Sequence, residues 1–244
     1  MYKIVLLRHG ESTWNKKGLW AGWTDVKLTS HGEQEAHEAG RRLKAAGFKF
    51  DLVFESFLER CSRTTSLAIK TMNIQPKVRK DWRLNERHYG ALQGVNKKEM
   101  VEKYGPEKVF AWRRSYSVRP PKIKKGSRYD QGDDILYRGI SVPRSESLHD
   151  VEKRIRPFWL EKVVPALKSK KMILISTSGN TLRALAKFLG KIPADKVAAV
   201  NIPTGLPLVY ELDKNFKLQK YYYLATKQEL TAAVQKVKNQ IKTK

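Results

Sequence analysis

The sequence predicts a single α/β domain, covering residues 1–244, whose central sheet is mostly parallel. Short apolar segments of strand length alternate with amphipathic segments of helix length along most of the chain. Strands that are separated by helices pair in parallel, because the crossover helix returns the chain to the same end of the sheet. Hydrophobic residues make up 41% of the chain, so a large core can form.

Buried strands are expected where short apolar runs are bounded by polar or turn residues. The clearest are 3–7 and 172–176, each of which ends at a cluster of polar residues. Two segments that flank Asp213-Lys214-Asn215 predict a hairpin near the C-terminus. The predicted strands are 3–7, 51–54, 77–79, 172–176, 208–212 and 218–223.

Helices are expected where apolar residues recur every three to four positions. The first, 30–46, begins with Ser30 and Glu33 at the spacing of a capping box, so Ser30 is its predicted N-cap. The other predicted helices are 58–72, a long helix within 146–167, 180–189, and 229–241 in a basic tail that covers 226–244.

Residues 92–143 interrupt this alternation of strands and helices. They include Arg119-Pro120-Pro121 and a polar stretch, 124–134, that has no periodicity. A long insert within one domain is usually a lid or a binding segment. We therefore expect residues 92–143 to cover a site rather than to form a second domain.

The charge balance narrows the class of partner. The chain has 49 Lys and Arg against 24 Asp and Glu, a net charge of +25. This suits either a binder of nucleic acid or membrane surfaces, or an enzyme that acts on small polyanions. The lysines are scattered and match no nucleic-acid-binding motif, which favours the small polyanion.

The cysteine content and the apolar segments indicate a cytoplasmic protein. Cys61 is the single cysteine, so no disulfide forms within the chain and a reducing compartment fits. The apolar run at the N-terminus is too short for a signal peptide, and no stretch approaches the ~20 apolar residues that span a bilayer. We expect no membrane partner.

Three polar segments are expected to meet at the carboxyl edge of the sheet, where open α/β sheets bind ligands. Arg8-His9-Gly10 follows the first strand, 176–180 joins a strand to a helix, and 83–90 is rich in ionisable groups. His9 is placed to act as a nucleophile. The arginines nearby indicate a phosphate site, because guanidinium groups bind phosphate through paired hydrogen bonds.

Five motifs together resemble the cofactor-dependent phosphoglycerate mutases of the histidine phosphatase superfamily. They are RHGESTWN at 8–15, GWTD at 22–25, the segment 82–90, WRRSY at 112–116 and NIPTG at 201–205. The resemblance implies a three-layer α/β sandwich, with a six-stranded sheet, helices on both faces, and a homodimer or homotetramer. It also implies 2,3-bisphosphoglycerate as the priming donor, no metal, and interconversion of 3-phosphoglycerate and 2-phosphoglycerate, which are small phosphorylated three-carbon acids.

The resemblance also implies a role for each matching residue. His9 would carry the phosphoryl group, and Glu86 would exchange a proton with the substrate hydroxyl. The alternative for Glu86 is an ion pair with Arg83 or Arg87. The implied catalytic set is His9, Glu86, Arg8, Arg60 and Ser178, and the implied substrate-binding set is Asn15, Ala21, Gly22, Arg87, His88, Tyr89, Lys97, Arg113, Arg114, Gly179 and Asn180.

Two positions depart from the family pattern. Ser178 stands where the family has a second histidine before Gly-Asn, and Ala21 stands where a small hydroxyl or thiol residue is usual. Losing one preorganised donor at a reacting centre costs about 10²–10³ in rate. Ser178 therefore predicts a mutase with reduced turnover.

Three alternatives to a mutase stay open. They are a small-molecule phosphatase, in which water accepts the phosphoryl group from His9, a bisphosphoglycerate synthase-like protein, and a non-catalytic pseudoenzyme that binds phosphoglycerates. Ser12 favours the mutase over the synthase, which tends to carry Gly there, and Arg113-Arg114 in the long insert argues against a broad phosphatase. Ser178 supports the pseudoenzyme.

Overall fold

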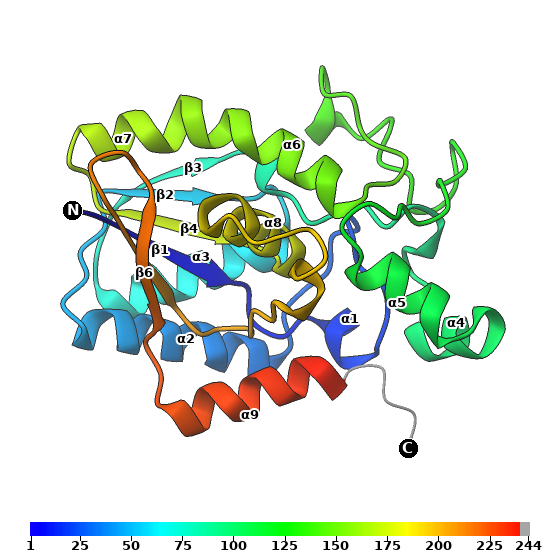
Figure 1. Cartoon of the computed structure of the whole chain (residues 1–244), viewed down its shortest axis with the longest axis horizontal. Coiled ribbons are helices and arrows are strands. Elements are labelled where there is room, and N and C mark those ends of the chain that lie inside the picture. Colours follow the sequence, from blue (N-terminus) through cyan, green and yellow to red (C-terminus); the bar gives the residue numbers. More distant parts are fainter. Residues whose placement is uncertain (240–244) are drawn as a thin grey trace.

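The computed structural model describes residues 1–239 and shows a six-stranded sheet between two layers of helices (Figure 1). Each predicted strand is present, and its ends lie within one residue of the predicted ones. The strand order across the sheet is β3-β2-β4-β1-β5-β6. The strands are β1 Tyr2–Arg8, β2 Leu52–Glu55, β3 Lys77–Lys80, β4 Ile173–Thr177, β5 Leu208–Leu212 and β6 Leu218–Tyr223.

The sheet is mostly parallel, as predicted. Strands β1, β2, β3 and β4 are parallel to their neighbours among these four, whereas β5 is antiparallel to β1 and forms the predicted hairpin with β6. The register pairs Arg8 with Thr177, and the His9 backbone N–H donates to the Thr177 carbonyl at 3.0 Å. This pairing brings the ends of β1 and β4 together at the carboxyl edge.

Helices cover both faces of the sheet, which confirms the three-layer sandwich. Alternate residues of β1 enter different apolar clusters, Ile4 and Leu6 on one face and Val5 and Leu7 on the other, as the two-residue period of a strand requires. The first cluster includes α6 and α8, and the second includes α2 and α3. The main helices are α2 Ser30–Ala45, α3 Glu59–Met72, α6 Leu148–Phe158, α7 Val164–Lys168, α8 Gly179–Gly190 and α9 Lys227–Lys238.

Helix α2 and the long helix predicted within 146–167 differ in detail from the predictions. The N-cap of α2 is Thr29 rather than Ser30, because the Thr29 hydroxyl accepts the Gly32 N–H at 3.0 Å. The long helix predicted within 146–167 contains a π-helical turn, Trp159–Val163, between α6 and α7. Pro165 follows this turn and lacks the N–H that an α-helix would use there.

The C-terminal helix α9 begins two residues earlier than predicted. Thr226 caps it, since its hydroxyl accepts the Glu229 N–H at 3.2 Å and the Glu229 carboxylate accepts the Thr226 N–H at 2.7 Å. The predicted end of this helix, at 241, and the last residues of the basic tail lie outside the described residues.

The insert at 92–143 contains two short helices that the sequence reading did not predict. Helix α4, Lys97–Tyr104, and helix α5, Pro106–Arg114, meet at Gly105, whose φ of 80° suits glycine. They pack beside the carboxyl edge of the sheet through Trp20, Val109 and Trp112. The insert is thereby held against the edge where β1 and β4 end.

Candidate active site

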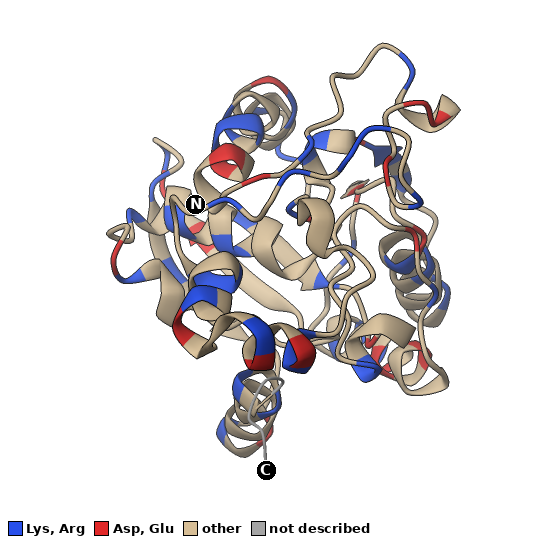
Figure 2. Ribbon diagram, turned by 90° about the vertical axis from the view of Figure 1, so that its right-hand side faces the viewer, with Lys and Arg blue, Asp and Glu red and all other residues tan. Residues whose placement is uncertain are grey.

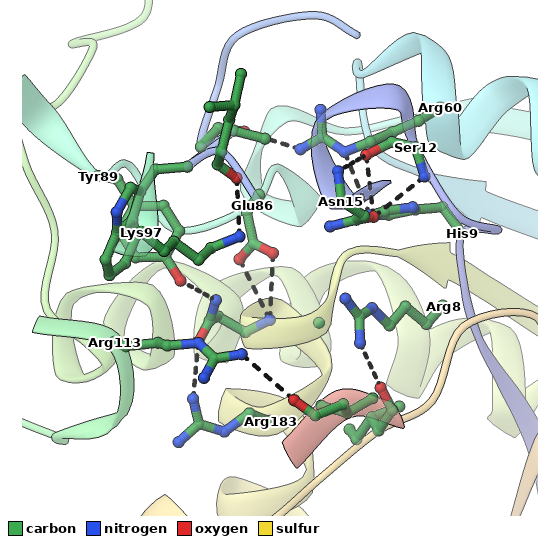
Figure 3. A pocket seen from close by; sticks show the side chains of 18 of the residues that line it. Arg8, His9, Ser12, Asn15, Arg60, Glu86, Tyr89, Lys97, Arg113 and Arg183 are labelled. Atoms are coloured by element: carbon green, nitrogen blue, oxygen red, sulfur yellow. Dashed lines mark hydrogen bonds between the residues drawn. The ribbon is translucent and has the colours of Figure 1, made fainter. Parts of the chain in front are cut away.

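A pocket of about 80 Å³ lies at this edge of the sheet, and six of its described lining residues are Lys or Arg (Figure 3). This volume suits a small ligand, because a single water molecule needs roughly 10–15 Å³ of accessible cavity volume. Glu86 is the carboxylate among the described lining residues. The charged or polar side chains of the lining are Arg8, His9, Ser12, Asn15, Arg60, Glu86, Tyr89, Lys97, Arg113, Arg114, Asn180 and Arg183.

His9 is held in one orientation at the end of β1. It is 3% exposed, and its Nδ1 lies 2.7 Å from the Gly10 carbonyl oxygen, which can only accept a hydrogen bond. The proton therefore sits on Nδ1, and the lone pair of Nε2 faces the Arg60 Nε at 3.3 Å. Burial lowers the pKa of His9 well below its usual value, and the charges of Arg60 and Arg8 lower it further. The result is a neutral imidazole with a nucleophilic Nε2 beside a cation.

Arg60, in the first turn of α3, is held beside His9 by the backbone of the loop at 22–24. Its two terminal nitrogens donate to the carbonyls of Thr24, at 3.0 Å, and Gly22, at 2.8 Å. Gly22 has a φ of +55°, and a Cβ there would lie 2.1 Å from the Gln93 side chain. A side chain at position 22 would therefore disturb the loop that orients Arg60.

Arg8 lies beside the start of α8. Its Nη1 donates to the Ile202 carbonyl at 2.7 Å, and its buried Nε has no hydrogen-bond partner among the described residues. Gly179 lets the helix approach, since a Cβ there would stand 3.1 Å from that Nε. The Arg8 guanidinium and the positive end of the α8 dipole therefore converge on the same part of the pocket.

Glu86 forms no ion pair with Arg83 or Arg87. Its carboxylate accepts the backbone N–H groups of Arg87, at 2.7 Å, and Asn180, at 3.2 Å. Arg83 pairs instead with Asp81 and Glu161, while the Arg87 guanidinium donates to the carbonyls of Trp112 and Arg113. The structure thus rules out the ion-pair interpretation and leaves Glu86 facing the pocket.

The insert supplies further cations to the pocket. Lys97 is buried and donates to the Leu19 carbonyl at 2.8 Å. Burial, together with the charges of Arg113 and Arg8, lowers its pKa to about 7. Burial and neighbouring arginines likewise lower the pKa of Arg113 to about 10 and that of Arg183 to about 9. A bound anion would offset this repulsion between cations.

Binding of an anion is expected to draw a proton onto Lys97. At pH 8 the amine is mostly neutral, because its pKa is about 7. An anion favours the charged form and raises that pKa, so protein and sulfate together should take up about one proton. Calorimetric titration with sulfate in two buffers of different ionisation enthalpy measures the uptake, and Lys97→Met should abolish it. Proton release by the unaltered protein would contradict this assignment.

Three of the sequence-predicted site residues lie behind the pocket wall rather than in its lining. The Ser178 Oγ is fully buried and 3.6 Å from the Cys61 Sγ. The His88 ring contacts the Gln131 side chain at 3.0 Å and accepts the Gly90 N–H. Arg87 stacks over the Tyr89 ring at 4.6 Å. The other sequence-predicted residues, Ala21 and Gly179 among them, line the pocket.

Six described residues that line the pocket are absent from the predicted site: Ser12, Leu19, Trp20, Arg183, Ile202 and Val237. Arg183 stands three residues after Asn180 on α8, and its Nη1 donates to the Asn180 Oδ1 at 2.8 Å. That i, i+3 spacing was the available signal. Val237 reaches the pocket from α9, where its carbonyl accepts from Arg113 at 3.4 Å. This contact joins distant parts of the chain, so no local sequence pattern predicts it.

Within the described part of the chain, no group of three or more His, Cys, Asp or Glu residues could hold a metal ion. Over the same residues, no helix combines the length and apolar character that a membrane crossing needs. Lys and Arg are spread over helices and loops rather than gathered in one block (Figure 2). In the pocket, by contrast, several Lys and Arg side chains lie together, so their positive charges add there.

The chain matches the model of a known protein family and is similar in fold to several solved structures. A family model described as histidine phosphatase superfamily (branch 1) matches residues 4–219. A mycobacterial glucosyl-3-phosphoglycerate phosphatase, solved with VO3, is similar in fold, with 22% identity, a TM-score of 0.72, and coverage of 93% of this chain and 100% of that one.

Two further solved structures share the fold. A putative alpha-ribazole-5'-phosphate phosphatase from Escherichia coli is 22% identical, with a TM-score of 0.65 and coverage of 92% of this chain and 98% of its own. YhfR from Bacillus stearothermophilus is also 22% identical, with a TM-score of 0.67 and coverage of 89% and 94%. At such identities the likeness concerns the fold.

Proposed function

The chain belongs to the histidine phosphatase superfamily, branch 1, and we propose that it transfers phosphoryl groups through a phosphohistidine on His9. The observation that carries this proposal is the state of His9. Its Nδ1 proton is directed to the Gly10 carbonyl, and its Nε2 stands beside Arg60 in a pocket lined by cations. A neutral nucleophile that points into an anion site suits attack on a phosphoryl group.

The proposed reaction has two mirrored halves. The Nε2 of His9 attacks phosphorus, the bond from phosphorus to the donor oxygen breaks, and the leaving oxygen takes a proton from Glu86. Arg8 and Arg60 stabilise the charge on the phosphoryl oxygens. In the second half an acceptor hydroxyl gives its proton to Glu86 and its oxygen takes the phosphoryl group from His9.

We further propose that the acceptor is a phosphoglycerate, and that the enzyme is a phosphoglycerate mutase primed by 2,3-bisphosphoglycerate. Two features support this substrate class. The small pocket suits a three-carbon acid, and its six cations, Arg8, Arg60, Lys97, Arg113, Arg114 and Arg183, suit a ligand with a phosphate and a second anionic group. Cytoplasmic location and a dimeric or tetrameric assembly stay predictions.

A phosphatase is the second candidate, because the glucosyl-3-phosphoglycerate and alpha-ribazole-5'-phosphate enzymes of similar fold carry that description. Water would then replace the acceptor hydroxyl. An enolase-coupled assay with 3-phosphoglycerate and a trace of 2,3-bisphosphoglycerate separates the two reactions. A mutase forms 2-phosphoglycerate in large excess over the 2,3-bisphosphoglycerate added, whereas hydrolysis of that primer yields at most one equivalent. Phosphate release without 2-phosphoglycerate would establish the phosphatase and overturn the mutase.

Ser178 is expected to limit the rate of this reaction. Its hydroxyl lies beside Cys61 behind the pocket wall and offers no hydrogen bond to a transferring phosphoryl group. The imidazole of Ser178→His extends further than a hydroxyl, so with its ring turned from Cys61 toward the pocket it should restore a donor and raise kcat by about 10²-fold. Ser178→Ala, the matched control, should leave kcat within about twofold, since no pocket contact is lost. A tenfold loss in the Ala variant would show that Ser178 already takes part.

A further inference from the structure

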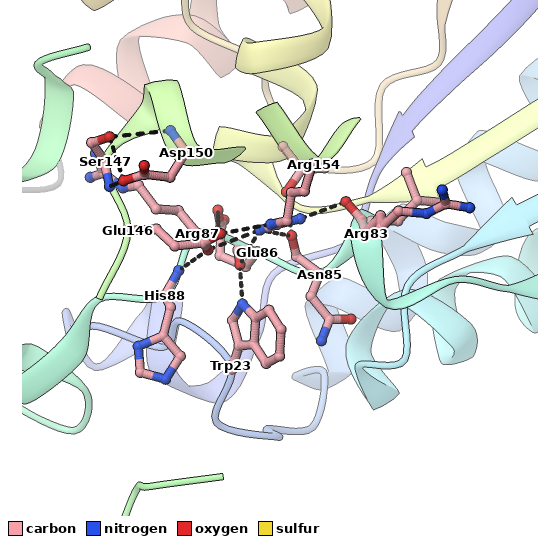
Figure 4. Close-up of polar contacts among 12 residues, drawn as sticks. Trp23, Arg83, Asn85, Glu86, Arg87, His88, Glu146, Ser147, Asp150 and Arg154 are labelled. Atoms are coloured by element: carbon pink, nitrogen blue, oxygen red, sulfur yellow. Dashed lines mark hydrogen bonds and ion pairs between the residues drawn. The ribbon is translucent and has the colours of Figure 1, made fainter. Parts of the chain in front are cut away.

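Behind the pocket, a buried ion pair forms hydrogen bonds to the backbone of the short segment that carries Glu86 (Figure 4). The pair is Arg154, in α6, and Glu146, just before that helix, with 2.8 Å between Nε and Oε1. Both side chains are at least nine-tenths buried, and neither lines the pocket. We propose that Arg154 and Glu146 are positioning residues, which hold Glu86 where it can exchange a proton with the reacting oxygen.

Arg154 binds three carbonyl oxygens of this segment. Its Nη1 donates to the Arg83 carbonyl at 2.5 Å, and its Nη2 donates to the carbonyls of Asn85, at 2.8 Å, and Glu86, at 3.0 Å. The Glu86 carbonyl also accepts from the Trp23 indole at 2.6 Å. One guanidinium therefore fixes the backbone before Glu86 and at Glu86 itself.

Glu146 fixes the backbone that follows. Its Oε2 accepts the His88 N–H at 2.8 Å and the Arg154 Nη2 at 3.0 Å, while the Glu146 N–H donates to the His88 carbonyl at 2.8 Å. His88 is therefore held to the same ion pair as Asn85 and Glu86. This ion pair therefore holds backbone groups at both ends of the turn from 83 to 88, while Trp23, Thr177 and Thr181 bind carbonyls between them.

The Glu86 carboxylate depends on this backbone for its position. Two backbone N–H groups, those of Arg87 and Asn180, hold it, and the first belongs to the same turn. Removing one member of a buried ion pair leaves the other charge unpaired, so the turn is expected to shift even where the fold survives. A displacement of about 1 Å at a reacting group costs about 10²-fold in rate.

The test uses two phosphoryl donors that differ in their need for an acid, and it rests on the proposed function. When 2,3-bisphosphoglycerate phosphorylates His9, its P–O bond breaks and the oxygen needs the proton of Glu86. When phosphoramidate phosphorylates His9 instead, its P–N bond breaks. The leaving ammonia needs no proton from Glu86, because the amino group of phosphoramidate already carries its protons. A purely structural role would slow both reactions alike, whereas a positioning role slows the first.

Rapid-quench measurement of His9 phosphorylation in Arg154→Lys and Glu146→Gln reports on both reactions. The expected result is a loss of about 10²-fold with 2,3-bisphosphoglycerate and a change below about threefold with phosphoramidate. Glu146→Gln keeps the shape of the side chain, so it preserves the test where Arg154→Lys fails to fold. Arg156→Lys is the matched control: Arg156 lies on the same helix, its side chain is 53% exposed, and it pairs with Glu152. Both donors should phosphorylate it normally.

Two results would overturn the positioning role. Equal losses with both donors would show that the ion pair only stabilises the fold, and unchanged rates with both would show that the Glu86 turn does not depend on it. If the unaltered protein accepts phosphate from neither donor, the proposed function itself fails, and the inference fails with it. The control reaction with phosphoramidate thus separates the two failures.

Discussion

Replacing His9 with Ala should abolish phosphoryl transfer, with a loss of turnover of about 10⁴-fold or more. Its Nε2 is the nucleophile that the geometry presents to the pocket, beside Arg60. The remaining arginines can still bind an anion, so sulfate should retain affinity for the variant. Steady-state assays with 3-phosphoglycerate and 2,3-bisphosphoglycerate, together with calorimetric titration of sulfate, measure the two properties separately.

His37→Ala is the control for the His9 variant. His37 lies on α2, contacts the Thr71 hydroxyl at 2.8 Å, and does not line the pocket. Its removal should leave turnover unchanged. Substantial activity in the His9 variant would mean that another group accepts the phosphoryl group.

Replacing Glu86 with Gln should lower kcat by about 10²–10⁴-fold, the usual contribution of a positioned acid or base. Gln keeps the size of the side chain and an oxygen that can accept the Arg87 N–H, but it cannot exchange the proton. The loss should be large with 2,3-bisphosphoglycerate as donor and small with phosphoramidate. Quenched-flow measurement of phosphorylated protein with each donor gives the two rates.

Glu55→Gln provides the matched control for Glu86. Glu55 is a buried carboxylate at the end of β2, burial raises its pKa, and it does not line the pocket. Its replacement should leave both donor reactions unchanged. A loss of equal size with both donors in the Glu86 variant would assign Glu86 to binding rather than to proton transfer.

The strands and the polar edge of the sheet could be predicted from the sequence, because both depend on local patterns. The apolar runs at 3–7 and 172–176 are bounded by polar residues, and parallel pairing then brings Arg8-His9 beside 178–180. The alternation of strands and helices led to the three-layer sandwich. These inferences need only residue order and the rule that parallel strands end at a common edge.

The parts that could not be predicted depend on tertiary contacts. The Ser178 side chain faces Cys61 rather than the pocket because α3 packs there, and no motif records that direction. Arg87 and His88 belong to a motif rich in ionisable groups, yet their side chains bond to carbonyls of α5 and to Gln131. Composition alone did not distinguish the side chains of this turn that face the ligand from those that support it.

The ion pair that holds the Glu86 turn could not be predicted from the sequence either, because it too depends on tertiary contacts. Glu146 and Arg154 are eight residues apart, and the carbonyls that Arg154 binds lie about seventy residues earlier in the chain. Their positions in the sequence are typical of an ordinary amphipathic helix. Only the packing of α6 beside the 83–88 turn reveals what the pair contacts.

Mass spectrometry of the peptide that contains His9 tests the central claim most directly. The protein is incubated with 2,3-bisphosphoglycerate, digested at alkaline pH to preserve phosphohistidine, and compared with a sample to which 3-phosphoglycerate is then added. A phosphoryl group on His9 that 3-phosphoglycerate removes faster than water does is the predicted result. An unmodified His9, or a phosphoryl group on another residue, would contradict the account.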